Sequence, residues 1–584
     1  MIFFRRLEPV RKLWIQIKEF RWRLLAGICL IGVTTGLDLV GPILIGKVAD
    51  IVLASPPDVS RLVRVCSWFL AVILLKAASE MSQAFVIQTT GLLITQKLRV
   101  EVFSRMARFP MSYYDEHSSG RLITRVINDV RSLSELFTAS MSVLALDVMV
   151  IVGTVIAMVV IDWQLALLVL LTFPVVLWAI FFFGEKLAEA YREARSKLSQ
   201  INSFLGENVS AMATIHRLGA QETRRCSFDG IVDSHQGALM KSIRAYAQVQ
   251  PWANVLNGIA MATLLGVGGA WVIQGKIKVG ILVAFLAYIR NLFQPIRDLV
   301  EKYNVVLSAF VSAERVAGVF DEPIEEDHGL TSPKVDRPCG VTFQDVSFCY
   351  GNRTEKALQN ISFKLQPGKT LAIVGATGSG KSTLAKLLLR FYEPSEGKIL
   401  LGNVPVNEWP RNILRQHVGF IPQDVYLFEG TVRENLSLAN QSLADSFLVE
   451  QCRKAQVWDF IERRGGLDLV INEGGQNLSL GEKQLLSFAR VFVLNPEVLV
   501  MDEATASLDN ASEARLMVAI RELLKGRTAL IIAHRLSTIE TCDQVIVLEK
   551  GQLKEQGNIA ELRKHQGIFE KFYRVYQQAS ERSL

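Results

Sequence analysis

Six long apolar stretches constrain the fold of this chain more than any other feature. They span residues 24–53, 62–92, 138–160, 164–184, 251–273 and 279–300. A helix of about 20 apolar residues crosses the hydrocarbon core of a bilayer, and inside lipid only helices and closed barrels satisfy every backbone polar group. Because each stretch reaches that length, the sequence predicts an all-α domain of six transmembrane helices embedded in a lipid bilayer.

The segment before the first stretch indicates how the chain enters the membrane. Residues 1–23 carry seven Arg or Lys and an amphipathic run of apolar residues, which is typical of a helix lying on a membrane surface. A cleavable signal peptide has a shorter apolar core that ends in small residues. We therefore expect the stretch 24–53 to be retained as a membrane helix.

The distribution of positive charge predicts the orientation of the chain. The connections 93–137 and 185–249 carry seven and nine Lys or Arg, whereas the other connections between stretches are short and carry few. The positive-inside rule then places the N-terminus, both long connections and everything after the sixth stretch in the cytoplasm, as in a multi-pass protein of the inner (cytoplasmic) membrane. Since this topology accounts for most of the net charge of +7, no nucleic-acid partner is expected.

The sequence of the two long connections does not predict disordered loops. Residues 97–109 and 186–204 continue the helical periodicity of the neighbouring stretches, so the helices are expected to extend into the cytoplasm. The turns at 112–120 and 216–222 either present short transverse helices to a domain on the cytoplasmic side or act as plain connectors between helices.

Four ionisable residues lie within or near the apolar stretches. They are Asp38, Glu80, Asp147 and Arg290. Charges at that depth are costly and usually face protein or a water-filled cavity. These groups either contact a substrate or, in the case of Arg290, pair with a carboxylate, and the sequence leaves both interpretations open.

The composition changes after the sixth stretch. We assign residues 1–317 to the membrane domain, and residues 318–340, which are acidic and contain prolines, to a linker. In the remaining residues, 341–584, short β-rich runs alternate with helical segments. This alternation predicts an α/β domain with a largely parallel sheet.

A glycine-rich loop in this second domain follows the apolar run 371–374 and precedes a helical repeat of leucines. It fits the P-loop pattern G-x-x-x-x-G-K-S/T in the strand–loop–helix context that the pattern requires. Its glycines let backbone N–H groups turn toward phosphate oxygens, and the helix N-terminus adds a favourable dipole. Lys381 is expected to reach the β- and γ-phosphates, and the Ser382 hydroxyl to hold Mg²⁺. The predicted phosphate site comprises Gly375, Ala376, Thr377, Gly378, Ser379, Gly380, Lys381, Ser382 and Thr383.

Two carboxylates follow a second buried run, residues 498–501. At the end of that strand Asp502 is placed to hold Mg²⁺, and Glu503 is placed to polarise the water that attacks the γ-phosphate. An apolar strand that ends in Asp-Glu is common by itself, but its specificity is high after a P-loop. These residues predict an ATPase site.

With these motifs in this order, the chain resembles a half-subunit of the exporter class of ABC transporters, in which a membrane domain is fused to its own P-loop ATPase domain. The resemblance covers essentially the whole chain and implies ATP and Mg²⁺ as cofactors. It implies that Tyr350 stacks on adenine, that Gln423 senses Mg²⁺ and the γ-phosphate, and that His534 contacts the γ-phosphate. Together with Glu503, Gln423 and His534 are the implied catalytic residues.

The signature segment departs from the family pattern. The usual Leu-Ser-Gly-Gly-Gln-Arg-Gln is Leu-Ser-Leu-Gly-Glu-Lys-Gln at 478–484. In the family this segment caps the γ-phosphate bound to the other subunit, which implies that Ser479 and Gly481 contact ATP. Leu480 adds bulk where the backbone must approach closely, and Glu482 places negative charge near a polyphosphate. Either the change is tolerated, or the site that this signature completes is weakened, as in a heterodimeric exporter whose intact half is this chain.

The resemblance also implies how the protein works. A second ABC half-transporter is the expected partner, and a heterodimer is favoured over a homodimer. Residues 507–509 match the loop that contacts the opposite subunit, and the turns at 112–120 and 216–222 match the coupling helices that relay ATP-driven closure to the membrane domain. The expected activity is export of a small amphipathic or lipid-like substrate. The alternative is an ATP-gated channel or regulator, which stoichiometric flux coupled to hydrolysis would exclude.

Overall fold

The computed structural model of the chain describes residues 2–54, 58–135, 141–325, 338–351, 355–438, 440, 442–502, 510–533, 535–565 and 567–581. The chain divides into two compact units. One consists of Met1–Arg108 and Ser118–Glu322, and the other of Phe109–His117 and Pro323–Leu584. The second unit therefore includes a short segment that interrupts the first in the sequence.

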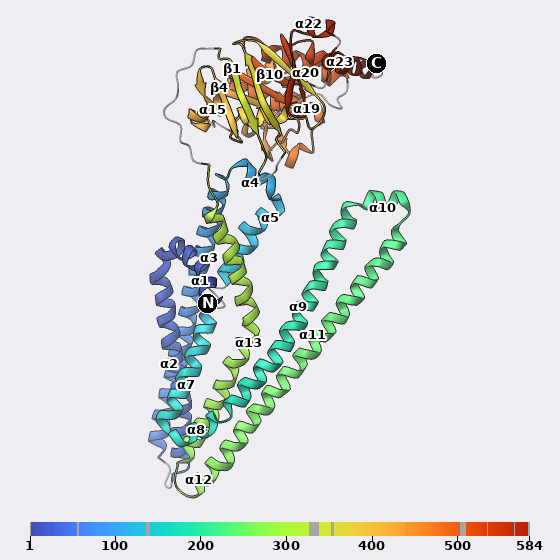
Figure 1. Ribbon diagram of the computed structural model, residues 1–584. Helices are drawn as coiled ribbons and strands as arrows, with labels where there is room; N and C mark the ends of the chain where they lie inside the picture. Colours follow the sequence, from blue (N-terminus) through green and yellow to red (C-terminus); the bar gives the residue numbers. More distant parts are fainter. Residues whose placement is uncertain are drawn as a thin grey trace. The chain divides into compact units, whose positions relative to one another are not determined.

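The first unit is built of helices (Figure 1). They are α1 (Ile2–Ile17), α2 (Arg21–Val52), α3 (Val59–Met106), α5 (Ser119–Thr124), α6 (Val130–Glu135), α7 (Met141–Ile161), α8 (Trp163–Leu170), α9 (Phe173–Ser210), α10 (Met212–Leu218), α11 (Gln221–Thr263), α12 (Gly269–Ile273) and α13 (Val279–Asp321). The predicted all-helical character of this part of the chain is thereby confirmed.

The number of membrane spans differs between the sequence prediction and the structure. Within the described part of the chain, four helical segments are long and apolar enough to cross a membrane, and the apolar run of α13 is shorter, at Val279–Leu292. The four segments are Arg11–Val52, Val59–Met106, Leu144–Ile161 and Asn254–Ile273. Six transmembrane helices therefore remain a prediction.

The apolar stretch 164–184 is not one continuous helix. It divides between α8 and α9, where residues 171–172 form a turn. The Asp162 side chain caps α8 by accepting the backbone N–H groups of Gln164 and Leu165, both at 3.0 Å. Pro174 lies in the first turn of α9, where the missing proline N–H has no helical partner to lose. Hydropathy alone could not show this break, because apolar residues surround it.

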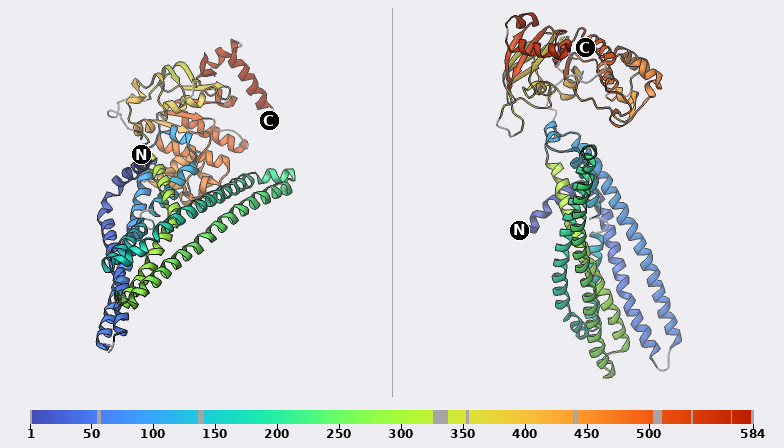
Figure 2. Two further views of the ribbon diagram at one scale, coloured as in Figure 1. Left: turned by 60° about the horizontal axis from the view of Figure 1, so that its bottom comes forward. Right: turned by 90° about the vertical axis from the view of Figure 1, so that its right-hand side faces the viewer.

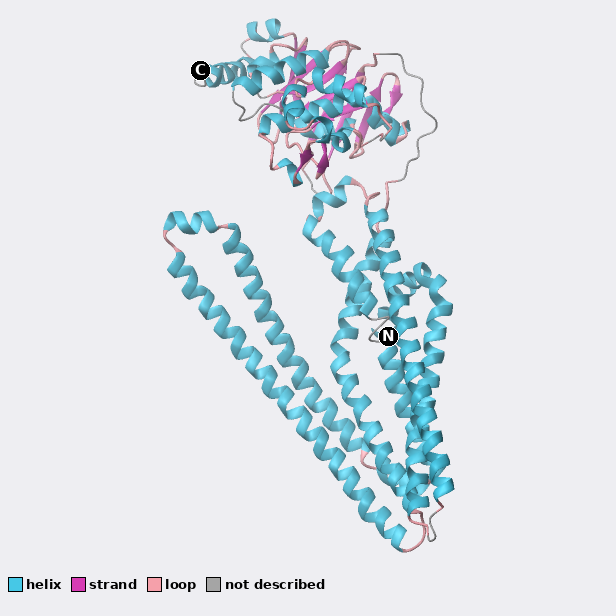
Figure 3. Ribbon diagram, turned by 180° about the vertical axis from the view of Figure 1, so that it is seen from behind, coloured by secondary structure: helices cyan, strands magenta, loops and turns pink. Residues whose placement is uncertain are grey.

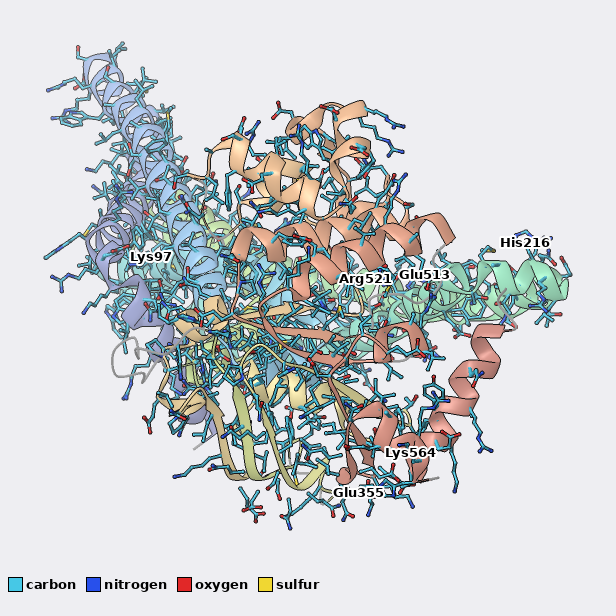
Figure 4. All side chains as sticks on the ribbon, turned by 90° about the horizontal axis from the view of Figure 1, so that it is seen from above. Lys97, His216, Glu355, Glu513, Arg521 and Lys564 are labelled. Atoms are coloured by element: carbon cyan, nitrogen blue, oxygen red, sulfur yellow. The ribbon has the colours of Figure 1, made fainter. Side chains whose placement is uncertain are left out.

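Long helices extend past the apolar stretches, as the periodicity predicted. α3 continues to Met106 and α9 to Ser210. Short helices also form near both predicted turns: α4 (Met111–Glu116) lies at the first, and α10 begins before the second, which was predicted at 216–222, and overlaps it only in part. α9 and α11 run side by side as a hairpin (Figures 1 and 2). His216 on α10 marks the tip of that hairpin (Figure 4).

Close backbone contact fixes α13 against α2. A Cβ atom at Gly46 would lie 2.3 Å from the carbonyl oxygen of Gly280, so neither position accommodates a larger residue without movement of the helices. The Asp50 carboxylate accepts the backbone N–H of Gly280 at 2.7 Å, which satisfies one of the free N–H groups in the first turn of α13. Further along, the Tyr288 hydroxyl donates to the Leu39 carbonyl at 2.6 Å.

The second unit carries all the strands of the described residues (Figure 3). The strands are β1 (Val341–Phe348), β2 (Leu358–Leu365), β3 (Thr370–Gly375), β4 (Glu396–Leu401), β5 (Val404–Pro405), β6 (Val418–Ile421), β7 (Gly430–Thr431), β8 (Val470–Ile471), β9 (Val498–Asp502), β10 (Thr528–Ile532), β11 (Gln544–Glu549) and β12 (Gln552–Gly557). Its helices besides α4 are α14 (Lys381–Leu388), α15 (Arg411–His417), α16 (Val432–Leu436), α17 (Asp445–Lys454), α18 (Trp458–Arg463), α19 (Leu480–Leu494), α20 (Asn510–Leu524), α21 (Leu536–Ile539), α22 (Ile559–Lys564) and α23 (Ile568–Glu581).

The strands form a predominantly parallel sheet, a smaller antiparallel one and the antiparallel pair β7-β8. The larger sheet has the order β12-β11-β3-β10-β9-β6, and only β12 pairs antiparallel in it. The smaller sheet has the order β2-β1-β4-β5. The α/β domain with a largely parallel sheet is confirmed, whereas the antiparallel sheet was not predicted. α14 packs into the hydrophobic core that both sheets share, so the helix that follows the P-loop is held firmly in place.

Candidate nucleotide site

The P-loop lies between the central strand of the larger sheet and α14. Every residue of β3 is buried, and β3 pairs in parallel with β10 on one side and β11 on the other. The loop therefore leaves the carboxyl end of a central strand, which is where ligands bind in open α/β sheets.

Two glycines of the loop have backbone conformations that favour glycine. Gly378 and Gly380 have φ angles of 81° and 101°. A Cβ atom at Gly380 would also lie 2.8 Å from the Ala357 carbonyl oxygen and 2.6 Å from the Leu358 side chain. These positions let the loop fold back tightly onto the first turn of α14, a loop conformation that in proteins commonly forms an anion-binding concavity.

The P-loop lysine is buried inside this loop. Only 6% of Lys381 is exposed, and its ammonium donates to the carbonyl oxygens of Gly375 at 2.7 Å and Ala376 at 3.0 Å. The Ser379 hydroxyl is also buried, and it makes no hydrogen bond to any described residue. A buried cation and a buried, unsatisfied hydroxyl in a loop that leads into a helix N-terminus fit the phosphates of a nucleotide.

A pocket of about 600 Å³ opens at this loop, a volume suited to a nucleotide. Its lining residues are Tyr350, Ala357, Thr377, Gly378, Gly380, Lys381, Ser382, Thr383, Gln423 and Asp502. Asp502 ends β9, and Gln423 follows the neighbouring parallel strand β6. The structure thus gathers predicted residues from three separate motifs around one cavity.

Three of the lining residues offer oxygen atoms that suit Mg²⁺. They are the hydroxyl of Ser382, the carboxylate of Asp502 and the side-chain carbonyl of Gln423. Mg²⁺ prefers such hard oxygen ligands and usually keeps several waters. The oxygen donors of this pocket therefore fit the predicted metal.

An aromatic cluster forms the wall of the pocket at Tyr350. Its ring lies edge-on to Phe348, with centroids 4.8 Å apart, and edge-on to Tyr392, at 5.1 Å. The Tyr350 hydroxyl is 3.1 Å from the Thr383 hydroxyl, and the Lys386 ammonium lies 5.6 Å from the centroid of the Tyr350 ring. Tyr350 is therefore held by contacts on several sides, which suits a platform for a base.

Helix α4 contacts this cluster from within the same compact unit. The Tyr392 hydroxyl donates a hydrogen bond to the Asp115 carboxylate, and the Lys386 ammonium lies 3.8 Å from that carboxylate. Burial, and next the bond to Asp115, raise the pKa of the Tyr392 hydroxyl well above its ordinary value, so it remains a donor. Sequence reasoning missed Asp115, Lys386 and Tyr392 because no motif links residues so far apart.

The signature segment lies at the start of α19 and does not line the pocket as described. Ser479 caps that helix: its hydroxyl accepts the Glu482 N–H at 3.3 Å, while the Glu482 carboxylate accepts the Ser479 N–H at 2.8 Å. Arg464 is 3.7 Å from the same carboxylate. Glu482 thus satisfies the helix end, a role that the S-x-x-E spacing could have indicated. Leu480 is half exposed.

Several predicted site residues lie outside the described residues. These are Glu503, His534 and the segment 507–509. Their assigned roles remain predictions, although Glu503 follows Asp502 directly in the sequence.

A helical membrane unit joined in one chain to an α/β unit with a P-loop pocket defines a membrane-bound nucleotide-binding protein. The family model of the ABC transporter transmembrane region matches residues 24–296, and the model described as ABC transporter matches residues 358–506. The chain belongs to the ABC transporters. It is an ATPase that couples ATP hydrolysis to transport.

Similar proteins cover most of the chain. An ATP-dependent lipid A-core flippase of Chromobacterium violaceum is 35% identical over 83% of this chain and 83% of its own length. A fatty acid ABC transporter ATP-binding/permease protein of Mycobacterium bovis is 34% identical over 88% of this chain and 81% of its own length. A probable multidrug resistance ABC transporter ATP-binding/permease protein of Bacillus subtilis is 32% identical over 89% and 77%, respectively.

Proposed function

We propose that this protein exports an amphipathic or lipid-like molecule across the cytoplasmic membrane by alternating access driven by ATP. The observation that carries the proposal is the single pocket that collects the P-loop, Gln423 and Asp502, in a chain that also holds the membrane domain. The names of the similar proteins refer to lipid A-core, fatty acids and multidrug resistance, which supports the substrate class. The proposed domain limits are 1–317, 318–340 and 341–584.

The proposed site uses ATP with Mg²⁺. Lys381 and the loop N–H groups hold the phosphates, Tyr350 stacks on adenine, and Ser382, Gln423 and Asp502 hold the metal, directly or through water. The metal supplies charge neutralisation at the β- and γ-phosphates. Glu503 orients the attacking water and His534 contacts the γ-phosphate.

We propose a second half-transporter as the partner. Two features support it: Ser479 and Gly481 begin a helix apart from this chain's own pocket, and the α9–α11 hairpin exposes large apolar side chains. On the proposed cytoplasmic extensions these include Leu198, Leu205, Val209, Leu239 and Ile243. Exposed apolar surface of this kind marks an interaction site. Leu480 and Glu482 favour a heterodimer, and the charge distribution supports a cytoplasmic N-terminus and ATPase domain.

Substitution of the P-loop lysine tests the site. Lys381→Ala removes the ammonium that holds the phosphates, so ATPase activity and export should both be abolished while the protein still inserts into the membrane. The assay is ATP turnover and transport by the purified complex in proteoliposomes. Export at the original rate with unchanged turnover would refute the assignment.

Substitution of the proposed catalytic carboxylate tests the mechanism. Glu503→Gln keeps the size of the side chain but no longer polarises water, so hydrolysis should fall by about two orders of magnitude or more. ATP still binds, and the closed dimer should accumulate in crosslinking experiments. Turnover at the original rate would place the general base elsewhere. Flux that continues without turnover would favour the gated channel.

A further inference from the structure

A row of polar side chains runs along one face of α3 at the middle of its apolar stretch. Its members are Lys76, Ser79, Glu80 and Gln83. This i, i+3, i+4, i+7 spacing places them on one side of the helix. They lie near the midpoint of the stretch 62–92, so in a transmembrane helix they sit near the centre of the bilayer.

The polar row faces a matching pair on α2, with which α3 packs as a hairpin (Figure 1). The Lys76 ammonium donates to the Asp38 carboxylate at 2.5 Å, and the hydroxyls of Thr34 and Ser79 are 2.8 Å apart and buried. Asp38 lies midway along the stretch 24–53. We call these six residues, Thr34, Asp38, Lys76, Ser79, Glu80 and Gln83, the polar seam.

The polar seam contains more negative than positive charge. Lys76 forms its close pair with Asp38, while the Glu80 carboxylate lies 3.7 Å from the same ammonium. Two carboxylates share one ammonium, so the seam carries a net charge of −1 when all three groups are ionised. An uncompensated charge at the centre of a membrane is costly and marks a functional site.

The seam is also open. The side chains of Asp38 and Lys76 are about one-third exposed, and that of Glu80 is 54% exposed. The side-chain carbonyl of Gln83, one turn further along α3, is buried and accepts no hydrogen bond from the described part of the chain. On the other side of Lys76, Phe69 and Ile73 continue the same face with apolar surface. The seam therefore offers a negative centre, hydrogen-bonding groups and an adjoining apolar strip.

We propose that the polar seam binds the cationic head of an amphipathic molecule, with Glu80 as its counter-ion and the strip of Phe69 and Ile73 against its apolar part. A cation neutralises the surplus negative charge of the seam, whereas an anion would meet Glu80 while Lys76 is already paired with Asp38. This inference rests on the proposed export function and narrows its substrate class to cationic amphiphiles.

Binding in the absence of nucleotide tests the site separately from transport. The probe is a dansyl-labelled alkyl trimethylammonium, titrated by fluorescence into the purified complex in zwitterionic nanodiscs, and its charge control is the same fluorophore on an alkyl sulfonate. Glu80→Gln should weaken binding of the cationic probe about tenfold, the loss of one charged contact, and leave the sulfonate unchanged. Glu101→Gln, an exposed position of α3 beyond the apolar stretch, should change neither.

For a second variant we expect the opposite change in affinity for the cationic probe. Lys76→Gln removes the ammonium and leaves both carboxylates, so the cationic probe should bind more tightly than to the unmodified protein. The proposal would be overturned if Glu80→Gln bound the cationic probe as tightly as the unmodified protein does, or if it lost the same affinity for both probes. Unchanged affinity of Glu80→Gln for the cationic probe is the result expected if a cationic side chain of the partner already neutralises the seam. Export of amphiphiles, measured in parallel, reports on the proposed function: charge-selective binding without any export would contradict that function and leave the site standing.

Discussion

At the scale of single residues, the P-loop shows how backbone geometry restricts the choice of amino acid. Gly378 and Gly380 both have positive φ angles, which cost an L-residue about 1–2 kcal/mol. The space around them differs, because a Cβ atom meets nothing within 4 Å at Gly378 but collides with Ala357 and Leu358 at Gly380. The two glycines can therefore be compared directly: alanine at either position would be strained, and at Gly380 it would also be crowded.

This difference predicts the effect of alanine at each position. Gly378→Ala should lower the stability of the nucleotide-free ATPase domain by the strain alone, about 1–2 kcal/mol. Gly380→Ala should lower it further, by about 1–3 kcal/mol, because packed atoms must move. The measurement is the thermal unfolding transition of the ATPase domain in the purified full-length protein without ATP. Equal shifts for the two variants would mean that the crowding at Gly380 is relieved at no cost.

At the scale of elements, α4 and the ATPase sheets share a charged and aromatic contact. Asp115 on α4 accepts the Tyr392 hydroxyl and attracts Lys386, and both of these side chains pack against Tyr350. Through these two side chains, α4 is connected to Tyr350, the residue that we expect to stack on adenine. We therefore expect movement of α4 and occupancy of the nucleotide site to influence each other through this contact.

The linkage predicts how substitutions here combine. Asp115→Asn keeps the shape but loses the charge that holds Lys386 and strengthens the Tyr392 bond, so the KM for ATP should rise several-fold. Tyr392→Phe, which removes the same bond from the other side, should add little in the Asp115→Asn background, since contacting residues are not additive. The assay is the ATP dependence of turnover, with the exposed Asp229→Asn on α11 as a control. Fully additive effects would show that the two residues act independently.

The same scale shows which features the sequence could predict. The buried run 371–374, the P-loop and Asp502 were predictable because short, local patterns define them. The contact of Asp115 with Tyr392 was not, since it joins residues distant in the chain, and neither was the break at 171–172, where neighbouring residues are all apolar. Lys76 was missed although its spacing with Ser79 and Glu80 was visible.

At the scale of the whole molecule, the signature segment combines a local role with a proposed role between two chains. Locally, Glu482 completes the capping box of α19, because its carboxylate accepts the backbone N–H of the N-cap residue Ser479. Glutamine serves the same capping position. Restoring the family pattern with Glu482→Gln therefore should not unfold the helix end. Its effect on turnover can then be separated from an effect on stability by comparison with Glu482→Ala, which loses the side-chain bond to the Ser479 N–H.

In the proposed dimer each signature completes the site built on the partner's P-loop, so Leu480→Gly combined with Glu482→Gln distinguishes two assemblies. In a heterodimer the site built on Lys381 and Glu503 uses the partner's signature, and turnover should change little because the partner is expected to lack a competent carboxylate. In a homodimer both sites contain the altered signature, and turnover should rise clearly as bulk and negative charge leave the γ-phosphate. The measurement is the ATPase rate of the purified complex, with its chains identified by mass spectrometry. A vigorous ATPase composed of this chain alone would exclude the heterodimer and show that Leu480 and Glu482 are compatible with a working site.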